Sequence, residues 1–363
     1  VLFHPLDLEI AEVVGIGAGA RIDVSDRGLL GSTAEDNMTL AGETPAERDA
    51  GGSHGGSGWF GSSSSYWDSS TLYHPSSSYG SVRKPRHPGA GGGGSSSYAG
   101  GAGGGVVRLD VSEGLVHLAG SILADGGDSG HGAGAGGSVL LAAAELTGNG
   151  LIAANGGSSE SNRGGGGGGG RIAVLYRELD AGVDLLAQTE TTGGVNEGEE
   201  VQRAGAGTVY LEQLDPVGGA SSGIGQLIVS NGAERAVAPT LMPSLGDATV
   251  VAVDPGAGTI TFAADRSRGS VTGDSLVVED SGGAVVGLFE ITGQRLVGGE
   301  VELEVAATSG ELSDLQTLLD GEDLSAHARA RYAEVSARGS VRLAVDDDLV
   351  VGPQGDPLPC LLY

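Results

Sequence analysis

The chain has 363 residues, of which 70 are glycine, and a formal net charge of −28 from 47 acidic and 19 basic side chains. This charge repels nucleic-acid phosphates and anionic lipids, so it excludes the basic surface typical of a nucleic-acid-binding protein. Glycine does not recur at every third position, which excludes a collagen triple helix. No run of about 18 apolar residues occurs, so we predict no membrane insertion.

Glycine-rich stretches alternate with short apolar segments in the first half of the chain. Equivalent residues Val107, Val139, Ile172 and Val209 follow one another at steps of 32, 33 and 37 residues, and an earlier copy lies at 17–24. Alternation of apolar and polar residues with a period of two predicts strands with one face turned inward. Units of this length cannot bury a face alone and must stack, so we predict a parallel β-solenoid over residues 1–215. Its predicted core residues are Ile22, Val24, Val107, Leu109, Ile122, Val139, Leu141, Ile152, Ile172, Val174 and Val209.

Each unit also carries a return path rich in glycine. The stretches 118–128 and 146–158 run through Asp or Asn into paired glycines, which favour turns with positive φ. We therefore interpret a unit as strand, turn, strand and glycine-rich return. The runs at 91–94, 101–105 and 164–170 hold too few apolar side chains to form core strands. We expect them to pack as extended polyglycine helices, and the alternative is that they are flexible linkers.

An insertion at about 50–104 separates the first copy from the others. It holds seven of the chain's fourteen aromatic residues. Exposed aromatic rings with a polar group stack on sugars or fill the pockets of a partner. Two interpretations follow: the rings pack back onto the solenoid, or they bind a glycan or a partner. The candidate binding residues are Trp59, Tyr66, Trp67 and Tyr73.

The composition changes after about residue 215. Glycine becomes sparse, and short alternating segments such as 248–254 and 300–307 are separated by turn residues. This pattern predicts a β-rich domain over 216–363, either a sandwich or further solenoid rungs. Within it, four leucines at helical spacing predict one short helix, so the expected fold class is all-β with one short helix in the C-terminal domain. These leucines are Leu312, Leu315, Leu318 and Leu319.

Carboxylates at predicted turns are the candidates for a metal site. Asp125 and Asp128 lie at one turn, and Asp346 and Asp347 belong to an acidic run. Calcium needs several converging oxygen atoms, and neither an EF-hand nor a glycine-aspartate repeat is present. We therefore predict no cofactor, with calcium at these four residues as the alternative.

No pattern of catalytic residues emerges from the sequence. The nucleophile elbow G-x-S-x-G is absent. Asp110, Glu113 and Glu145 do not occupy equivalent positions of the repeats, as paired acid and base groups on a β-helix would. We predict that the chain is not an enzyme, and the alternative is a carbohydrate-active β-helix enzyme.

Several of these segments together carry a resemblance. The series 100–109, 134–141, 146–157, 164–176 and 206–211 resembles the glycine-rich solenoid segments of very large extracellular proteins of environmental bacteria. In composition it is also similar to the glycine-rich region of the anaplastic lymphoma kinase ectodomain and to phage tail-tip adhesins, which bundle polyglycine helices. The resemblance implies an extracellular or cell-surface location and transfers no catalytic residue. The chain starts at Val1, and we expect it to be a portion of a longer protein.

These expectations combine into a structural role. We expect a non-enzymatic extracellular module of a surface fibre, filament or surface layer. An exposed solenoid end is an edge strand open to a partner, so we expect self-association into a homo-oligomer or filament. The alternative is an adhesin that binds glycans or a partner surface through the aromatic loop 59–98.

Overall fold

The computed structural model describes residues 5–33, 38–39, 43–62, 72–161, 163–196, 202–246, 248–263, 269–321, 323–341, 343–344 and 348–351. These residues form mostly β-strands, with two short helices, α1 (Leu185–Gln188) and α2 (Leu312–Leu319). The all-β fold class is therefore confirmed.

The chain divides into two compact units. The first contains Val1–Leu241 and Val335–Ala344, and the second contains Met242–Glu334 and strand β25 (Asp348–Val351). The predicted boundary, at residue 215, follows the fall in glycine content. The first unit continues past it because strand β15 (Gln226–Arg235) pairs with the strand that precedes the boundary.

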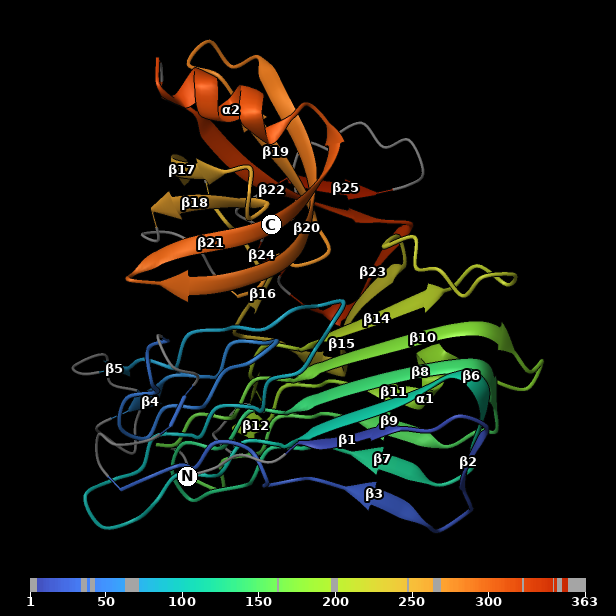
Figure 1. The fold of residues 1–363 in the computed structure, drawn as a ribbon. Coiled ribbons are helices and arrows are strands. Elements are labelled where there is room, and N and C mark those ends of the chain that lie inside the picture. Colours follow the sequence, from blue (N-terminus) through green and yellow to red (C-terminus); the bar gives the residue numbers. More distant parts are fainter. Residues whose placement is uncertain are drawn as a thin grey trace. The chain divides into compact units, whose positions relative to one another are not determined.

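A large sheet with a parallel centre forms the frame of the first unit (Figure 1). Val107 lies opposite Val139, Val139 opposite Ile172, and Ile172 opposite Val209. The alignment of repeats inferred from the sequence is thus the register of the sheet. In spatial order its strands are β1 (Leu6–Glu9), β6 (Val106–Leu118), β8 (Ser138–Thr147), β10 (Arg171–Leu179), β14 (Thr208–Gln213), β15 and β23 (Glu334–Ser340), and β2 (Val13–Ile16) also pairs with β6.

A smaller parallel sheet encloses the other side of the apolar core. The second apolar stretch of each unit supplies its strands, in the order β11 (Thr189–Glu190), β9 (Leu151–Ala153), β7 (Ser121–Leu123) and β3 (Arg21–Asp23). Side chains from both sheets, such as Leu109 and Ile122, meet in one buried cluster. All eleven predicted core residues belong to this cluster, with Ile22 and Val24 partly buried at its border.

The sheets do not form a clear solenoid. This corrects the prediction of a regular parallel β-solenoid over residues 1–215. Parallel stacking ends at β14, because β15 returns along it antiparallel with Ile228 opposite Val209. The sheet β6–β8 is also irregular between Val111 and Leu115, where the two strands change register. Two further pairs are short: β12 (Val195–Asn196) with β13 (Gln202–Arg203), and β16 (Thr240–Leu241) with β24 (Leu343–Ala344).

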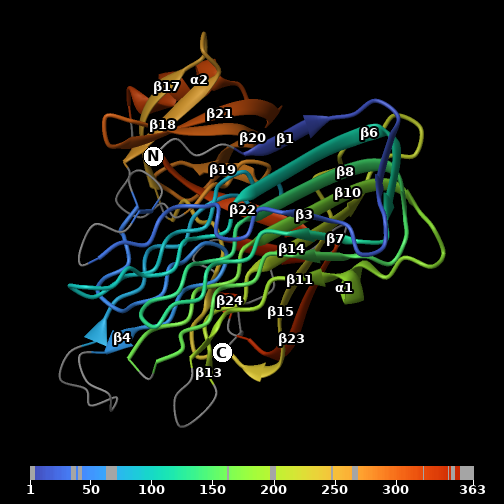
Figure 2. The ribbon, with the colours of Figure 1, turned by 90° about the horizontal axis from the view of Figure 1, so that it is seen from below.

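The glycine-rich segments lie side by side and are joined by backbone hydrogen bonds (Figure 2). Successive N–H groups of one segment reach different neighbours: that of Gly103 donates to the carbonyl of Leu29 and that of Gly104 to the carbonyl of Ala135, both over 2.8 Å. A Cβ atom built on Gly134 would lie 1.9 Å from the carbonyl oxygen of Ala102. Only glycine lets backbones approach this closely. These segments are therefore ordered packing elements and not flexible linkers.

The insertion joins the same bundle. The N–H of Gly52 donates to the carbonyl of Ala133, and the N–H of Gly93 donates to that of Ala50. Its own glycine runs make this packing feasible, since they present no side chains to the neighbouring segments. A short hairpin of β4 (Gly61–Ser62) and β5 (Leu72–Tyr73) also forms within it.

The second unit contains a closed barrel of six antiparallel strands. Pairing of Ala248 with Ala326 joins the first strand to the last and closes the ring. Closure corrects the expected sandwich or solenoid rungs, because a closed sheet buries its inner face without a second sheet. The ring runs β17 (Ala248–Asp254), β18 (Thr259–Ala263), β21 (Glu300–Ser309), β20 (Val285–Val297), β19 (Ser275–Glu279) and β22 (Ser325–Tyr332), and β25 adds to β22.

Helix α2 packs against this barrel. Leu315 is fully buried in the cluster that contains Phe262 and Phe289, while Leu312 and Leu318 lie partly buried beside it. The helix predicted from the leucine spacing is confirmed. Its leucine face closes part of the apolar interior of the second unit.

Candidate functional site

Turns of several glycine-rich segments meet at one end of the bundle. Parallel bridges join Ser129 to Ser159 and Ser159 to Asn196, and the hydroxyl of Ser129 donates to the carbonyl of Ala99 over 3.3 Å. Because the repeats are in register, equivalent positions of successive turns become neighbours. The resulting polar cluster, called the turn site below, comprises Arg48, Asp49, Tyr98, Ser129, His131, Ser159, Ser161 and Arg163.

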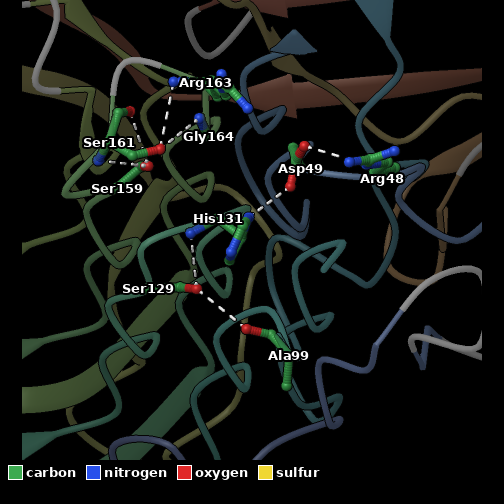
Figure 3. Close-up of polar contacts among 9 residues, drawn as sticks. All are labelled: Arg48, Asp49, Ala99, Ser129, His131, Ser159, Ser161, Arg163 and Gly164. Carbon is green, nitrogen blue, oxygen red and sulfur yellow. Dashed lines mark hydrogen bonds and ion pairs between the residues drawn. The ribbon is translucent and has the colours of Figure 1, made fainter. Parts of the chain in front are cut away.

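A buried carboxylate and an imidazole stand at the centre of the turn site (Figure 3). Asp49 has a side chain only 4% exposed, and its Oδ1 lies 2.7 Å from Nδ1 of His131. Its Oδ2 lies 3.4 Å from Nε of Arg48. A carboxylate at Nδ1 keeps a proton on that nitrogen and leaves Nε2 as the outward atom. The imidazole, 24% exposed, thus has a fixed orientation and a second nitrogen directed away from Asp49.

The backbone holds Asp49 in place. Its φ of 59° lies in the left-handed region, which Asp tolerates better than most residues other than glycine. Its carbonyl accepts the N–H of Gly165 over 2.7 Å, and the carbonyl of Ala50 accepts the N–H of Gly93 over 2.8 Å. The residue that orients His131 is therefore anchored by two different glycine segments.

The serines of the turn site hold their own turns. The hydroxyl oxygen of Ser129 accepts the backbone N–H of His131 over 3.0 Å, and that of Ser161 accepts the N–H groups of Arg163 and Gly164. Such bonds stabilise tight turns. Within the described ranges, none of these hydroxyls is hydrogen-bonded to Nε2 of His131. The arrangement offers a positioned imidazole rather than an assembled serine nucleophile.

An exposed tyrosine lies on the imidazole. Tyr98 is 66% exposed, and its ring stacks on His131 with centroids 5.4 Å apart and planes inclined by 19°. Its carbonyl accepts the N–H of Ser95 over 2.9 Å, which closes the turn that carries it. The tyrosine ring therefore contacts His131 and still leaves most of its side-chain surface exposed.

The aromatic residues predicted to bind a ligand have different surroundings. Trp59 is partly buried, its backbone N–H donates to the carbonyl of Gly166, and its ring meets that of Phe60 edge to face at 5.3 Å between centroids. Tyr73 lies partly buried on β5. Tyr66 and Trp67 lie outside the described residues. Binding through this set remains a prediction.

A second polar cluster is buried inside the bundle. His54 is fully buried, its Nδ1 lies 2.9 Å from the carbonyl of Gly136, and its ring is 4.9 Å from that of Tyr79. Nε of Arg171 donates to the carbonyl of Tyr79 over 3.0 Å. Burial and the charge of Arg171 lower the pKa of His54 to about 3, and burial raises the pKa of Tyr79. Both rings are therefore neutral at physiological pH, and this cluster joins insertion to sheet.

The proposed calcium ligands take part in a ladder between repeats. Oδ1 of Asp125 accepts the N–H of Asn155 over 2.6 Å, and Oδ1 of Asp128 accepts that of Ser158 over 2.6 Å. Burial is the main cause that raises the pKa of Asp125. Asp346 and Asp347 lie outside the described residues. Among the described residues no three His, Cys, Asp or Glu side chains converge as a metal site would require, and calcium binding remains a prediction.

Sequence reasoning missed the turn site. Tyr98 and His131 are 33 positions apart, which equals one step of the repeat, so the period itself could have placed them together. Asp49 had no comparable signal, because its left-handed backbone and its burial arise only in the folded bundle. In the part of the chain that the structure describes, no helix is long and apolar enough to cross a membrane.

Comparison with known proteins yields no relative: no family model, no curated protein and no solved structure matches this chain.

Proposed function

We propose that the chain is a rigid, non-enzymatic structural module of an extracellular surface fibre or surface layer. The glycine network carries this proposal. Cβ atoms built on Gly134, Gly168 and Gly194 would lie 1.9 Å or less from carbonyl oxygens of neighbouring segments. Segments this close, each bonded to more than one neighbour, cannot slide or bend independently. This packing adds stiffness to that supplied by the apolar core between the sheets.

The finer architecture of the proposal is a solenoid-like stack with polyglycine-type helices. Its support is the parallel register of β6, β8, β10 and β14 and the divergent N–H directions of successive glycines. A ladder of side chains supports it further, since Oδ1 of Asn155 accepts the N–H of Thr192 over 2.8 Å, as Asp125 does for Asn155 one repeat earlier.

Hydrogen exchange measured by mass spectrometry tests the rigid bundle. We expect peptides that cover 101–105 and 132–137 to be protected as strongly as β8, because their N–H groups are bonded to carbonyls of neighbouring segments. Exchange of these peptides at the rate of an unfolded linker would contradict the proposal. Electron microscopy of the purified chain then tests assembly into fibres or layers.

Adhesion is the second candidate function, and one observation favours it. Tyr98 is strongly exposed yet supported by a stacked and anchored imidazole. A ring held in this way serves a binding surface better than it serves the packing of the scaffold.

A further inference from the structure

We propose that the turn site is a binding site for a neutral glycan, with Tyr98 as its stacking platform. This inference goes beyond the structural role: the scaffold can stand whether or not the site binds. It also concerns residues other than the predicted set around Trp59 and Tyr73.

The platform has the geometry that a sugar ring requires. Pyranose rings present an apolar face of C–H groups, which packs on an aromatic face, while tyrosine also offers its hydroxyl. An isolated surface tyrosine would lose rotational freedom on binding. Tyr98 is already oriented by its stacking on His131 at 19°, and His131 is fixed by the 2.7 Å contact with Asp49. The entropic cost of ordering the platform is therefore reduced before a ligand arrives.

The turn site and its flanking residues supply polar groups of both kinds. His131 offers Nε2, and the guanidinium of Arg48, 47% exposed, extends towards Asp49 on its other side (Figure 3). Exposed Arg163 comes from the turn of the next repeat, and exposed Ser96 and Ser97 precede Tyr98. Donors and acceptors on neighbouring turns match the hydroxyl pairs of a sugar, which need both.

The local charge favours a neutral ligand over an acidic one. Arg48 is paired with Asp49, and the turns that carry Arg163 also carry exposed Asp128 and Glu160. At physiological ionic strength only charges within about 8 Å act strongly. The Arg48–Asp49 pair carries no net charge at this range, and the whole chain carries −28. A sulfated or uronic acid polymer would therefore be repelled, and the recognisable chemistry is that of hydroxyl groups and C–H faces.

Affinity electrophoresis of the full chain in gels that contain a polysaccharide tests the site. The panel holds the neutral polymers dextran, laminarin and mannan, and the acidic polymers dextran sulfate and alginate. We expect at least one neutral polymer to retard the wild-type chain. Tyr98→Ala should weaken this binding at least tenfold, while Tyr98→Phe keeps it within about threefold, because the ring face remains. His131→Asn should weaken it by a smaller factor, as a positioning residue would.

Val217→Ala, at a position that is 94% exposed on the turn after β14, is the control and should bind as the wild type does. Circular dichroism and hydrogen exchange of each variant show that the fold is intact, so loss of binding with full protection of 132–137 separates the site from the scaffold. Three results would overturn the inference: no retardation by any neutral polymer of the panel, equal retardation of the wild type and Tyr98→Ala, or retardation by the acidic polymers alone.

Discussion

At the scale of single residues, glycine positions differ sharply within one segment. A Cβ atom on Gly134 would lie 1.9 Å from the carbonyl oxygen of Ala102, whereas a Cβ atom on Gly130 would meet nothing within 4 Å. The two glycines are therefore a matched pair. Abundant glycine in the sequence does not distinguish between them, because the distinction depends on which backbone lies alongside.

We predict that Gly134→Ala lowers the free energy of unfolding by about 3 kcal/mol or more, since overpacking against a backbone carbonyl cannot be relieved by rotating a side chain. Gly130→Ala should leave it unchanged or raise it by up to about 1 kcal/mol through the reduced entropy of the unfolded chain. Urea denaturation of both variants measures the difference. Equal stability of the two would mean that the bundle is not packed as described.

The buried imidazole of His54 makes stability depend on pH. Burial and the charge of Arg171 lower its pKa to about 3, against 6.5 for the ordinary group. Below pH 6.5 the unfolded chain takes up a proton that the folded chain refuses, so this contribution to stability is present above pH 6.5 and lost as the pH falls towards 3. At about 1.4 kcal/mol per pH unit, the loss at pH 5 is on the order of 2 kcal/mol.

His54→Gln should remove this part of the pH dependence, whatever it does to stability at neutral pH. The measured quantity is the change in the free energy of unfolding between pH 7.5 and pH 5.0, compared between wild type and variant. His117→Gln, at an exposed position, serves as the control and should keep the wild-type dependence. A variant at position 54 with the same pH dependence as the wild type would refute the assignment.

The sequence predicts residues well where they repeat and poorly where the contact is unique. Core residues such as Val139 and Ile172 recur at a constant step with a constant chemistry, so their register followed directly. The 2.7 Å contact of Asp49 with His131 occurs once and joins segments 82 residues apart. No local pattern records such a pair, although the repeat step brings Tyr98 and His131 into the same neighbourhood.

At the scale of elements, strands were predictable and their closure was not. Alternation within 248–254 and 300–307 predicts strands in any antiparallel sheet. Whether the sheet stays open, stacks on another or closes depends on one pairing, that of Ala248 with Ala326. Apolar and polar residues alternate in the same way in the strands of a sandwich and of a barrel. The sequence pattern therefore cannot distinguish the two architectures.

Helix α2 provides an element-scale prediction for the second unit. Leu315 is fully buried among barrel residues that include Phe289, so Leu315→Ala leaves a cavity and should cost about 3 kcal/mol. Leu318→Ala, at a partly buried position of the same helix, should cost clearly less. Hydrogen exchange within β20 reports the stability of this unit. If both substitutions accelerate its exchange equally, the helix does not bury the leucine face described here.

At the scale of the whole molecule, the negative net charge opposes self-association, whereas the open edge of the large sheet favours it. In the described part of the chain, β1 and β2 form the outer edge of the large sheet, where Leu8 is 38% and Val13 is 59% exposed. Open edges with exposed apolar side chains favour pairing with another strand. The net charge of −28 opposes contact between identical chains, and the edge itself carries Asp7 and Glu9.

The balance between these effects predicts that self-association depends on salt. The Debye length falls from about 30 Å at 0.01 M to about 3 Å at 1 M ionic strength, so repulsion between chains is removed while burial of the edge is not. Sedimentation velocity should therefore show monomers at 0.01 M NaCl and larger species at 1 M. Val13→Asp should keep the chain monomeric at 1 M, because it adds a charge to the edge at a position that pairing would bury.

Val217→Asp is the corresponding control, since Val217 is 94% exposed and lies on the turn after β14 rather than on an edge strand. It adds the same charge and should assemble as the wild type does. Monomers at both salt concentrations would exclude self-association as the basis of a fibre. If both substitutions block assembly equally, the added negative charge itself, and not its place on the edge strand, would explain the loss of assembly. Only a difference between two exposed valines, one on the edge strand and one off it, assigns the contact to the edge of the sheet.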